Sequence, residues 1–195
     1  MARPAKFSLD DLLDAASRVL LEEGRDITMA QIADAAGAPT GSVYHRFASR
    51  EELLIRLWLR SIKRFQVGFT RAGEQGEARS AVIEMALCVP QFCRKHPADA
   101  KATTLFRQED LLSTTTGDLR KEVESLNEDI DAVTENLGVR RYGAMNERRR
   151  ALLYLATRIS PYGLLRPFIG ADVPSWIDDA VAASAGAIAG LGDES

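Results

Sequence analysis

Three helix-start signals close to the N-terminus constrain the fold more than any other feature of the sequence. Each is a serine or threonine suited to capping a helix, followed three residues later by a side chain that reaches back to the cap. The pairs are Ser8 with Asp11, Thr28 with Gln31, and Ser49 with Glu52. Apolar residues then recur at helical spacing, whereas the alternation typical of strands is almost absent. The pattern predicts an all-α chain.

Glycine and proline residues mark the ends and starts of the expected helices. Gly24 and Gly37 end the first two helices, and Pro39 opens a very short third one. We expect a bend at Pro90 and an interruption near Pro161, because proline removes an internal hydrogen bond. About nine helices are predicted, in the approximate ranges 9–23, 28–36, 39–47, 49–73, 78–95, 97–112, 118–137, 146–168 and 172–191.

The length of 195 residues allows a sizeable core without a disulfide or a structural metal. We divide the chain into a small N-terminal unit, residues 1–48, and a larger helical remainder, residues 49–195. The segment 118–137 carries apolar residues in alternating steps of four and three, which predicts packing along a narrow seam. These residues are Leu119, Val123, Leu126, Ile130, Val133 and Leu137.

Composition excludes some classes of protein and leaves others open. The net charge of −3 gives no overall sign of affinity for nucleic acid, so any basic patch must be local. No apolar run approaches the roughly 20 residues that span a bilayer. The N-terminus lacks the apolar stretch of a signal peptide, so we expect a cytoplasmic protein.

The second and third helices, with the turn between them, have the pattern of a helix-turn-helix. Residues 29–36 form the first helix, 37–39 the turn and 39–47 the second helix. Val43 and Phe47 lie four residues apart and should dock the second helix on the core. The outer or flanking sides then carry Gly41, Ser42, Tyr44 and His45.

Each outward residue suits contact with a DNA duplex. Gly41 allows a close approach of the backbone to the groove, and Ser42 and His45 exchange hydrogen bonds with base edges. Tyr44 and Thr28 offer hydroxyl groups to phosphates. A sixth residue, at the start of the helix from residue 49, adds a charge for the DNA backbone; it is Arg50.

This region resembles the tetracycline-repressor (TetR) family of bacterial transcription regulators over about residues 9–58. The resemblance rests on spaced residues that include Ala15, Ala16, Leu20, Gly24, Thr28, Ile32, Ala33, Ala36, Gly37, Gly41, Ser42, Val43, Tyr44, Phe47, Ser49, Arg50, Glu51, Glu52 and Leu53. It implies DNA contacts at Thr28, Thr40, Ser42, Tyr44, His45 and Arg50. The family often has lysine at the position of Arg50, and the remainder of the chain matches only in the number and length of its helices.

Several aromatic and apolar residues of the larger unit are candidates to line a cavity for a hydrophobic ligand. The alternative is that they fill the core, as such residues usually do. The candidates are Phe65, Phe69, Met85, Phe92, Phe106 and Tyr154, with Arg107 as a polar member.

Cys88, Cys93 and His96 raise the question of a metal site. A zinc site usually needs four ligands, and the other histidine lies in the helix assigned to DNA. We therefore expect two buried thiols, no metal and no cofactor. A redox role of the cysteines stays an alternative.

Small residues near the C-terminus favour close helix packing across a two-fold interface. An ordinary contact within the chain is the alternative. The interface candidates are Leu152, Leu153, Ala156, Ile159, Val181, Ser184, Ala185 and Ile188.

The sequence thus predicts a homodimeric, DNA-binding transcriptional regulator, most simply a repressor released from its operator by a small hydrophobic effector. The resemblance implies that the effector changes the separation of the two recognition helices. The main alternative is a DNA-binding protein that needs no effector and acts through partner proteins or DNA architecture. An enzyme lacks support, because no nucleophile–base pair and no phosphate loop are present.

Overall fold

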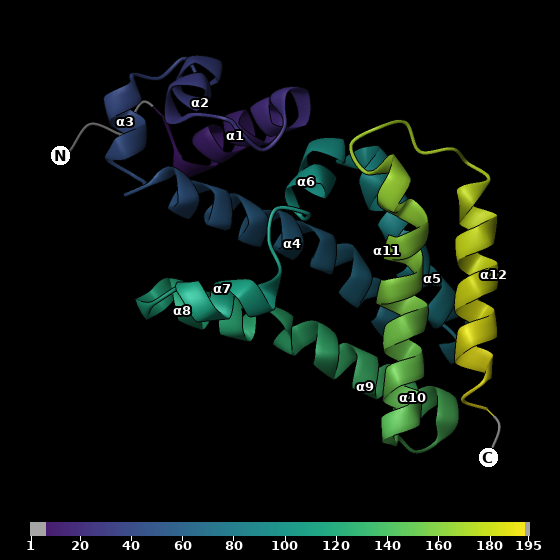
Figure 1. The fold of residues 1–195 in the computed structure, drawn as a ribbon. Helices are drawn as coiled ribbons and strands as arrows, with labels where there is room; N and C mark the ends of the chain where they lie inside the picture. Colours follow the sequence, from purple (N-terminus) through teal and green to yellow (C-terminus); the bar gives the residue numbers. More distant parts are fainter. Residues whose placement is uncertain (1–6, 194–195) are drawn as a thin grey trace.

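The computed structural model describes residues 7–193, and every regular element in that range is a helix (Figure 1). The N-terminal helices are α1 (Leu9–Glu23), α2 (Met29–Ala35) and α3 (Thr40–Tyr44). They are followed by α4 (Arg50–Glu74), α5 (Ala78–Lys95), α6 (Pro97–Ala102), α7 (Gln108–Thr114), α8 (Gly117–Glu124) and α9 (Glu128–Tyr142). The last helices are α10 (Glu147–Tyr154), α11 (Ser160–Leu165) and α12 (Ile177–Gly190). The all-α prediction is confirmed.

Local capping interactions position the N-terminal helices as the sequence predicts. Ser8 and Thr28 each form a complete capping box, with reciprocal bonds to Asp11 and Gln31. Gly24 follows α1 with φ of 84°, a conformation that favours glycine. The third signal differs in one bond. Ser49 caps α4 through the amide of Glu52, but the Glu52 carboxylate accepts from the amide of Ala48 rather than that of the cap.

α1 to α3 surround one apolar core that extends along the first half of α4. Val43 and Phe47 lie in this core and are both 0 % exposed. α4 is the longest helix, with 25 residues, and runs from beneath the three N-terminal helices into the rest of the molecule (Figure 1). It is therefore the direct connection between the two units that the sequence predicts.

The helix predicted over 97–112 is split into α6 and α7. The hydroxyls of Thr103 and Thr104 donate to the carbonyls of Ala100 and Lys101, in competition with the helical ladder. Beyond this break, the seam predicted over 118–137 is confirmed as an inner face. Its residues are buried apart from half-buried Leu119, although a short 3-10 turn, Ser125–Asn127, separates α8 from α9.

Proline has different effects in the two helices where it was expected to matter. α5 continues through Pro90 without a break. The predicted interruption near Pro161 is present as a π-helical segment, Leu155–Ile159, in which the amide of Ser160 donates to the carbonyl of Leu155. Pro161 follows at once; it has no N–H, and its ring crowds the carbonyl four residues earlier. The rod α10–α11 is therefore wound more widely at its centre.

α11 and α12 lie beside α5 on the side of the molecule far from α3 (Figure 1). α12 begins at Ile177, later than predicted, because Pro174 restrains the preceding residue to an extended conformation. Its inner face packs on α5 and α11 through Val181 and Ala185. Among the described residues, no helix is long and apolar enough to cross a membrane.

Candidate nucleic-acid interface and effector cavity

The outer face of α3 is open to solvent although its inner face is completely covered. Gly41, Tyr44 and His45 are exposed, and Tyr44 is 58 % exposed despite its large aromatic ring. Ser42 is half-buried at the flank, and Thr40 is exposed at the start of the helix. A Cβ atom added to Gly41 would meet nothing within 4 Å, so the space in front of this glycine is open.

Two arginines beside α3 hold the backbone of the N-terminal unit together. The guanidinium of Arg50 donates to the carbonyls of Ile27 and Arg25, and that of Arg46 donates to the carbonyl of Phe7. Arg50 thus ties the start of α4 to the loop before α2. The Thr28 hydroxyl, predicted to meet a phosphate, is exposed and donates to the side chain of Gln31.

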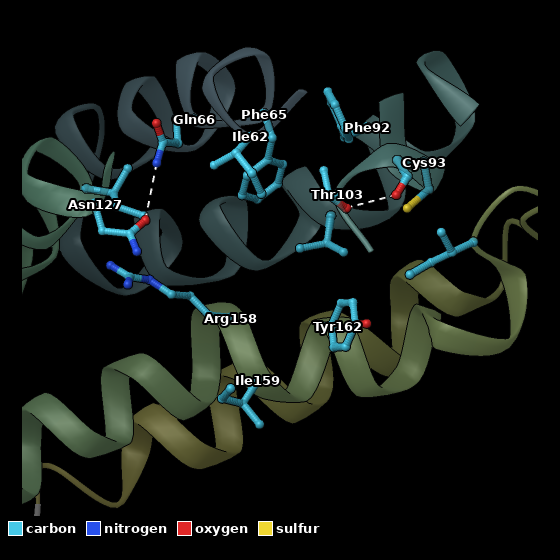
Figure 2. A pocket seen from close by; sticks show the side chains of 14 residues that line it. Ile62, Phe65, Gln66, Phe92, Cys93, Thr103, Asn127, Arg158, Ile159 and Tyr162 are labelled. Carbon is cyan, nitrogen blue, oxygen red and sulfur yellow. Dashed lines mark hydrogen bonds between the residues drawn. The ribbon is translucent and has the colours of Figure 1, made fainter. Parts of the chain in front are cut away.

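A mostly apolar cavity of about 290 Å³ lies among α4, α5, α6, α9 and the α10–α11 rod. Its walls combine apolar side chains with a few polar ones (Figure 2). The apolar lining is Ile62, Phe65, Val89, Phe92, Cys93, Ala100, Ile130, Ile159 and Ile169, and the polar lining is Gln66, Thr103, Asn127, Arg158 and Tyr162.

Of the cavity candidates from the sequence, Phe65 and Phe92 line this space and stack edge-to-face, with ring centroids 5.5 Å apart. Phe69 and Met85 are 0 % exposed and belong to the core behind it, as in the alternative interpretation. The remaining candidates lie elsewhere. Phe106 and Arg107 line two other pockets, one of which shares Thr103, Tyr162 and Ile169 with this cavity. Tyr154 is 46 % exposed on α10.

Comparison with known proteins decides the family. The sequence profile of bacterial regulatory proteins of the tetR family matches residues 12–57. This chain is a TetR-family transcriptional regulator. The matched range contains most of α1, all of α2 and α3, and the first part of α4. This is the unit whose outer helix, α3, is exposed. The family consists of DNA-binding regulators and not of enzymes.

Solved structures share the fold of this TetR-family regulator along nearly its whole length. A transcriptional regulator from Rhodococcus sp. Rha1 is 17 % identical with a TM-score of 0.75, covering 96 % of this chain and 99 % of its own. The ketosteroid regulator KstR2 of Mycobacterium tuberculosis is 18 % identical with a TM-score of 0.67, covering 97 % of each chain. FadR of Bacillus subtilis, solved with stearoyl-CoA, is 18 % identical with a TM-score of 0.59, covering 96 % and 98 %. Among the curated proteins, none matches.

The polar residues that line the regulator's cavity are not among the ligand-site residues predicted from the sequence. Gln66, Asn127 and Arg158 come from three helical segments far apart in the chain. Arg158 is the one charged residue in the mostly apolar segment Leu152–Ile159, and this is the signal that could have identified it as a cavity residue. The other two resemble ordinary surface amides in the sequence.

Half of the predicted interface residues of the regulator are enclosed within a single protomer. Leu153, Ala156, Val181 and Ala185 are 0 % exposed, so they pack inside the chain. Leu152, Ser184 and Ile188 are half-buried, and Ile159 is 46 % exposed. The exposed positions of these helices lie next to the predicted ones in sequence, as expected when the inner and outer faces of one helix alternate.

Polar contacts tie the cavity to the DNA-binding unit of the regulator. Asp99 of α6 is 5 % exposed and accepts hydrogen bonds from Ser61 at 2.7 Å and from Arg64 at 2.9 Å. Arg64 also faces Asp14 of α1 at 3.5 Å. The indole of Trp58 donates to the carbonyl of Thr103, a cavity residue, at 3.1 Å. These contacts connect α6 to α4 directly and, through Arg64, to α1.

The two cysteines are free thiols, and Cys93 is buried beside the cavity. Burial raises the pKa of each thiol to about 11. No group of metal-binding side chains is found in the part of the chain that the structure describes.

We expect both thiols to be alkylated slowly by iodoacetamide at neutral pH. Their pKa lies about two units above the ordinary 9.0, so the reactive thiolate is about a hundredfold scarcer. The rate should rise with pH until the thiols ionise. Mass spectrometry of the folded protein, with the urea-unfolded chain as the control, measures the rates. Equal rates for the two forms would contradict this expectation.

Proposed function

We propose that this TetR-family regulator is a homodimeric repressor that leaves its operator when a small hydrophobic effector fills the cavity. The observation that carries the proposal is the free outer face of α3, where Gly41, Tyr44 and His45 are exposed while Val43 and Phe47 are buried. A helix docked in this way is able to enter the major groove with its outer side chains against base edges.

The proposed DNA contacts divide into two kinds. Ser42 and His45 read base edges, and Gly41 permits the close approach that this requires. Tyr44, Thr28 and the exposed start of α3 at Thr40 meet phosphates and set the register. We assign Arg50 a part in positioning, because its guanidinium holds the loop before α2; a contact of the same group with the DNA backbone stays a proposal.

The proposed dimer interface is the outer face of the α10–α11 rod and of α12. These helices lie side by side, and the hydroxyls of Ser160 and Ser184 bond across them at 2.6 Å. Their outer faces expose several apolar residues, and an exposed apolar patch of this kind often marks a protein–protein interface. The residues are Leu155, Ala183, Ala187 and Leu191. A two-fold pairing through this face also supplies the two recognition helices that half-sites require.

Release from DNA follows from the contacts around α6. Ala100 and Thr103 line the cavity, while Asp99 and the Thr103 carbonyl hold α4, and through Arg64 also α1. An effector that binds better when α6 is displaced shifts the population toward a state with the wrong spacing of recognition helices. Because its proposed target is DNA, we propose that the protein acts in the cytoplasm.

Two structural neighbours support a hydrophobic effector. One was solved with stearoyl-CoA, and the other is a ketosteroid regulator. The apolar cavity in the larger unit argues against the alternative function, which is DNA binding without an effector.

The test of the DNA contacts is a gel shift with an operator selected from random DNA. We expect Tyr44→Ala to weaken binding about tenfold for each half-site, the value of one lost hydrogen bond to a charged group. Tyr44→Phe isolates the hydroxyl and should lose most of the same affinity. Circular dichroism should show both variants folded, because Tyr44 is exposed. Unchanged affinity in both would remove Tyr44 from the interface.

The test of release is a titration of the protein–operator complex with hydrophobic compounds that bind the protein in calorimetry. A bound compound should weaken the gel shift. A compound that fills the cavity and leaves operator affinity unchanged would favour the effector-independent alternative.

A further inference from the structure

The cavity has a polar end and an apolar end, which restricts the chemistry of its ligand. Figure 2 shows Gln66, Asn127 and Arg158 at one end, with Phe92, Cys93 and Tyr162 further along. A ligand that matches both ends is amphipathic, with one polar group and one apolar body. The volume of about 290 Å³ is at the lower limit of ligand cavities, roughly 300 Å³. The ligand is therefore compact.

Arg158 sets the charge of the polar end. It is the single charged residue among the fourteen that line the cavity, and its side chain is 19 % exposed. The guanidinium is held between aromatic groups, 5.3 Å from the ring centroid of Tyr154 and 5.7 Å from that of Phe69. Its position is therefore fixed before any ligand binds, which lowers the entropic cost of binding.

The hydrogen bonds of Arg158 leave one buried donor without a partner. Its Nη2 group donates to Asp131 at 2.8 Å and to Thr134 at 3.3 Å. Its Nε–H is buried and has no partner among the described residues. A buried donor without an acceptor is unfavourable, and an acceptor on the ligand would satisfy it.

The neighbouring amides add a second donor and no charge. Gln66 donates to the Leu126 carbonyl and to the Asn127 side chain, and Asn127 donates one amide hydrogen to Gln108. The second amide hydrogen of Asn127 has no partner among these bonds. Two donors, one of them on a cation, match the two oxygens of a carboxylate better than a neutral carbonyl or hydroxyl.

Asp131 does not cancel this preference. It lies outside the cavity lining, and its side chain is 63 % exposed, so water screens its charge. It pairs with Arg158 at the exposed edge of the site, while Figure 2 shows the guanidinium directed toward Asn127 at the polar end of the cavity.

We propose that the effector is a compact hydrophobic carboxylic acid, with its carboxylate on Arg158 and Asn127 and its apolar body toward Phe92. The inference rests on the proposed function in taking this cavity as the effector site. It adds that the free acid, and not its neutral ester or amide, is the form bound.

The experiment compares acids with their neutral counterparts. The probes are octanoic, decanoic and phenylbutyric acids, each with its methyl ester and primary amide. Calorimetry measures binding, and tryptophan fluorescence of a Trp176→Phe background provides a second readout. In that background the remaining indole is Trp58, which bonds to the cavity residue Thr103. We expect the acids to bind at least about tenfold more tightly than the neutral forms, as for a charge-assisted hydrogen bond.

Three variants assign the effect to Arg158. Arg158→Met should lose about tenfold or more in affinity for the acids and little for the esters. Arg150→Met is the matched control, because Arg150 lies on the same rod and also pairs with an acid of α9, Glu135. It should leave acid binding unchanged. Asp131→Asn should tighten acid binding, because it removes a competing carboxylate.

If Arg158→Met does not fold by circular dichroism, Asp131→Asn and the acid–ester comparison decide the matter. Failure of every acid to bind the wild-type protein, equal binding of neutral forms, or full acid affinity in folded Arg158→Met would overturn the proposal. Gel shifts in parallel separate the two claims. Neutral compounds that bind as tightly as the acids and release DNA leave the proposed function intact and refute the acid preference. Acids that bind without release support the preference and refute the function.

Discussion

Phe47→Ala is expected to lower the free energy of unfolding by about 3–5 kcal/mol and to abolish operator binding. Phe47 is 0 % exposed and closes the core formed by α1 to α4 just after α3 ends. Removing its ring leaves a cavity beneath the recognition helix, because the helices around it are each held by other contacts and collapse only in part. Urea denaturation followed by circular dichroism measures the loss of stability.

The control for this prediction is the neighbouring exposed tyrosine. Tyr44→Ala should change the free energy of unfolding by no more than about 0.5 kcal/mol, since Tyr44 is 58 % exposed. The two substitutions thus separate the docking of α3 from its contact with DNA. If Phe47→Ala keeps both its stability and its operator affinity, the core described here does not hold α3 in place.

Ala187→Arg is expected to weaken dimerisation by at least about a hundredfold. Ala187 is exposed on the outer face of α12, at the centre of the proposed interface. An arginine there would bury an unpaired charge between the two protomers, at a cost of about 3–5 kcal/mol. Sedimentation equilibrium gives the dissociation constant. Operator affinity should fall in parallel, because a monomer contacts one half-site only.

Ser113→Arg is the matched control for the dimer prediction. Ser113 is exposed on α7, on the opposite side of the molecule from α12 in Figure 1. The same charge at this position should leave the dimer intact. A dimer that withstands Ala187→Arg would show that the protomers pair through another surface, or not at all.

The N-terminal helices were readable in the sequence because their determinants are local. The capping bonds of Ser8 and Thr28 join residues three apart, and the positive φ after α1 depends on Gly24 alone. The split of the 97–112 helix into α6 and α7 was not predicted from the sequence. Hydroxyl bonds of Thr103 and Thr104 compete with a helix that periodicity alone predicts.

The residues at the polar end of the cavity could not be predicted from spacing in the sequence. Gln66, Asn127 and Arg158 converge only when α4, the 3-10 turn before α9, and the rod of α10 and α11 are packed together (Figure 2). Phe69 and Met85 show the same limit from the other side: both were cavity candidates, and both fill the core. An aromatic residue on an inner face has the same spacing in the sequence whether its neighbour is a side chain or an empty space.

Helix type, helix starts and the inward direction of Val43 and Phe47 follow from the residues, because they depend on interactions within a turn or two of one helix. The assignment of inner faces to core, cavity or partner depends on how all the helices pack, and these contacts join residues far apart in the chain. For this reason Leu153 and Ala156, which were predicted to lie in the interface, are enclosed within the protomer. Leu155 and Ile159 on the same rod are exposed. The π-helical turn before Pro161 changes which residues of the rod face inward. A prediction from helical periodicity misses this change, because it assumes a regular turn throughout.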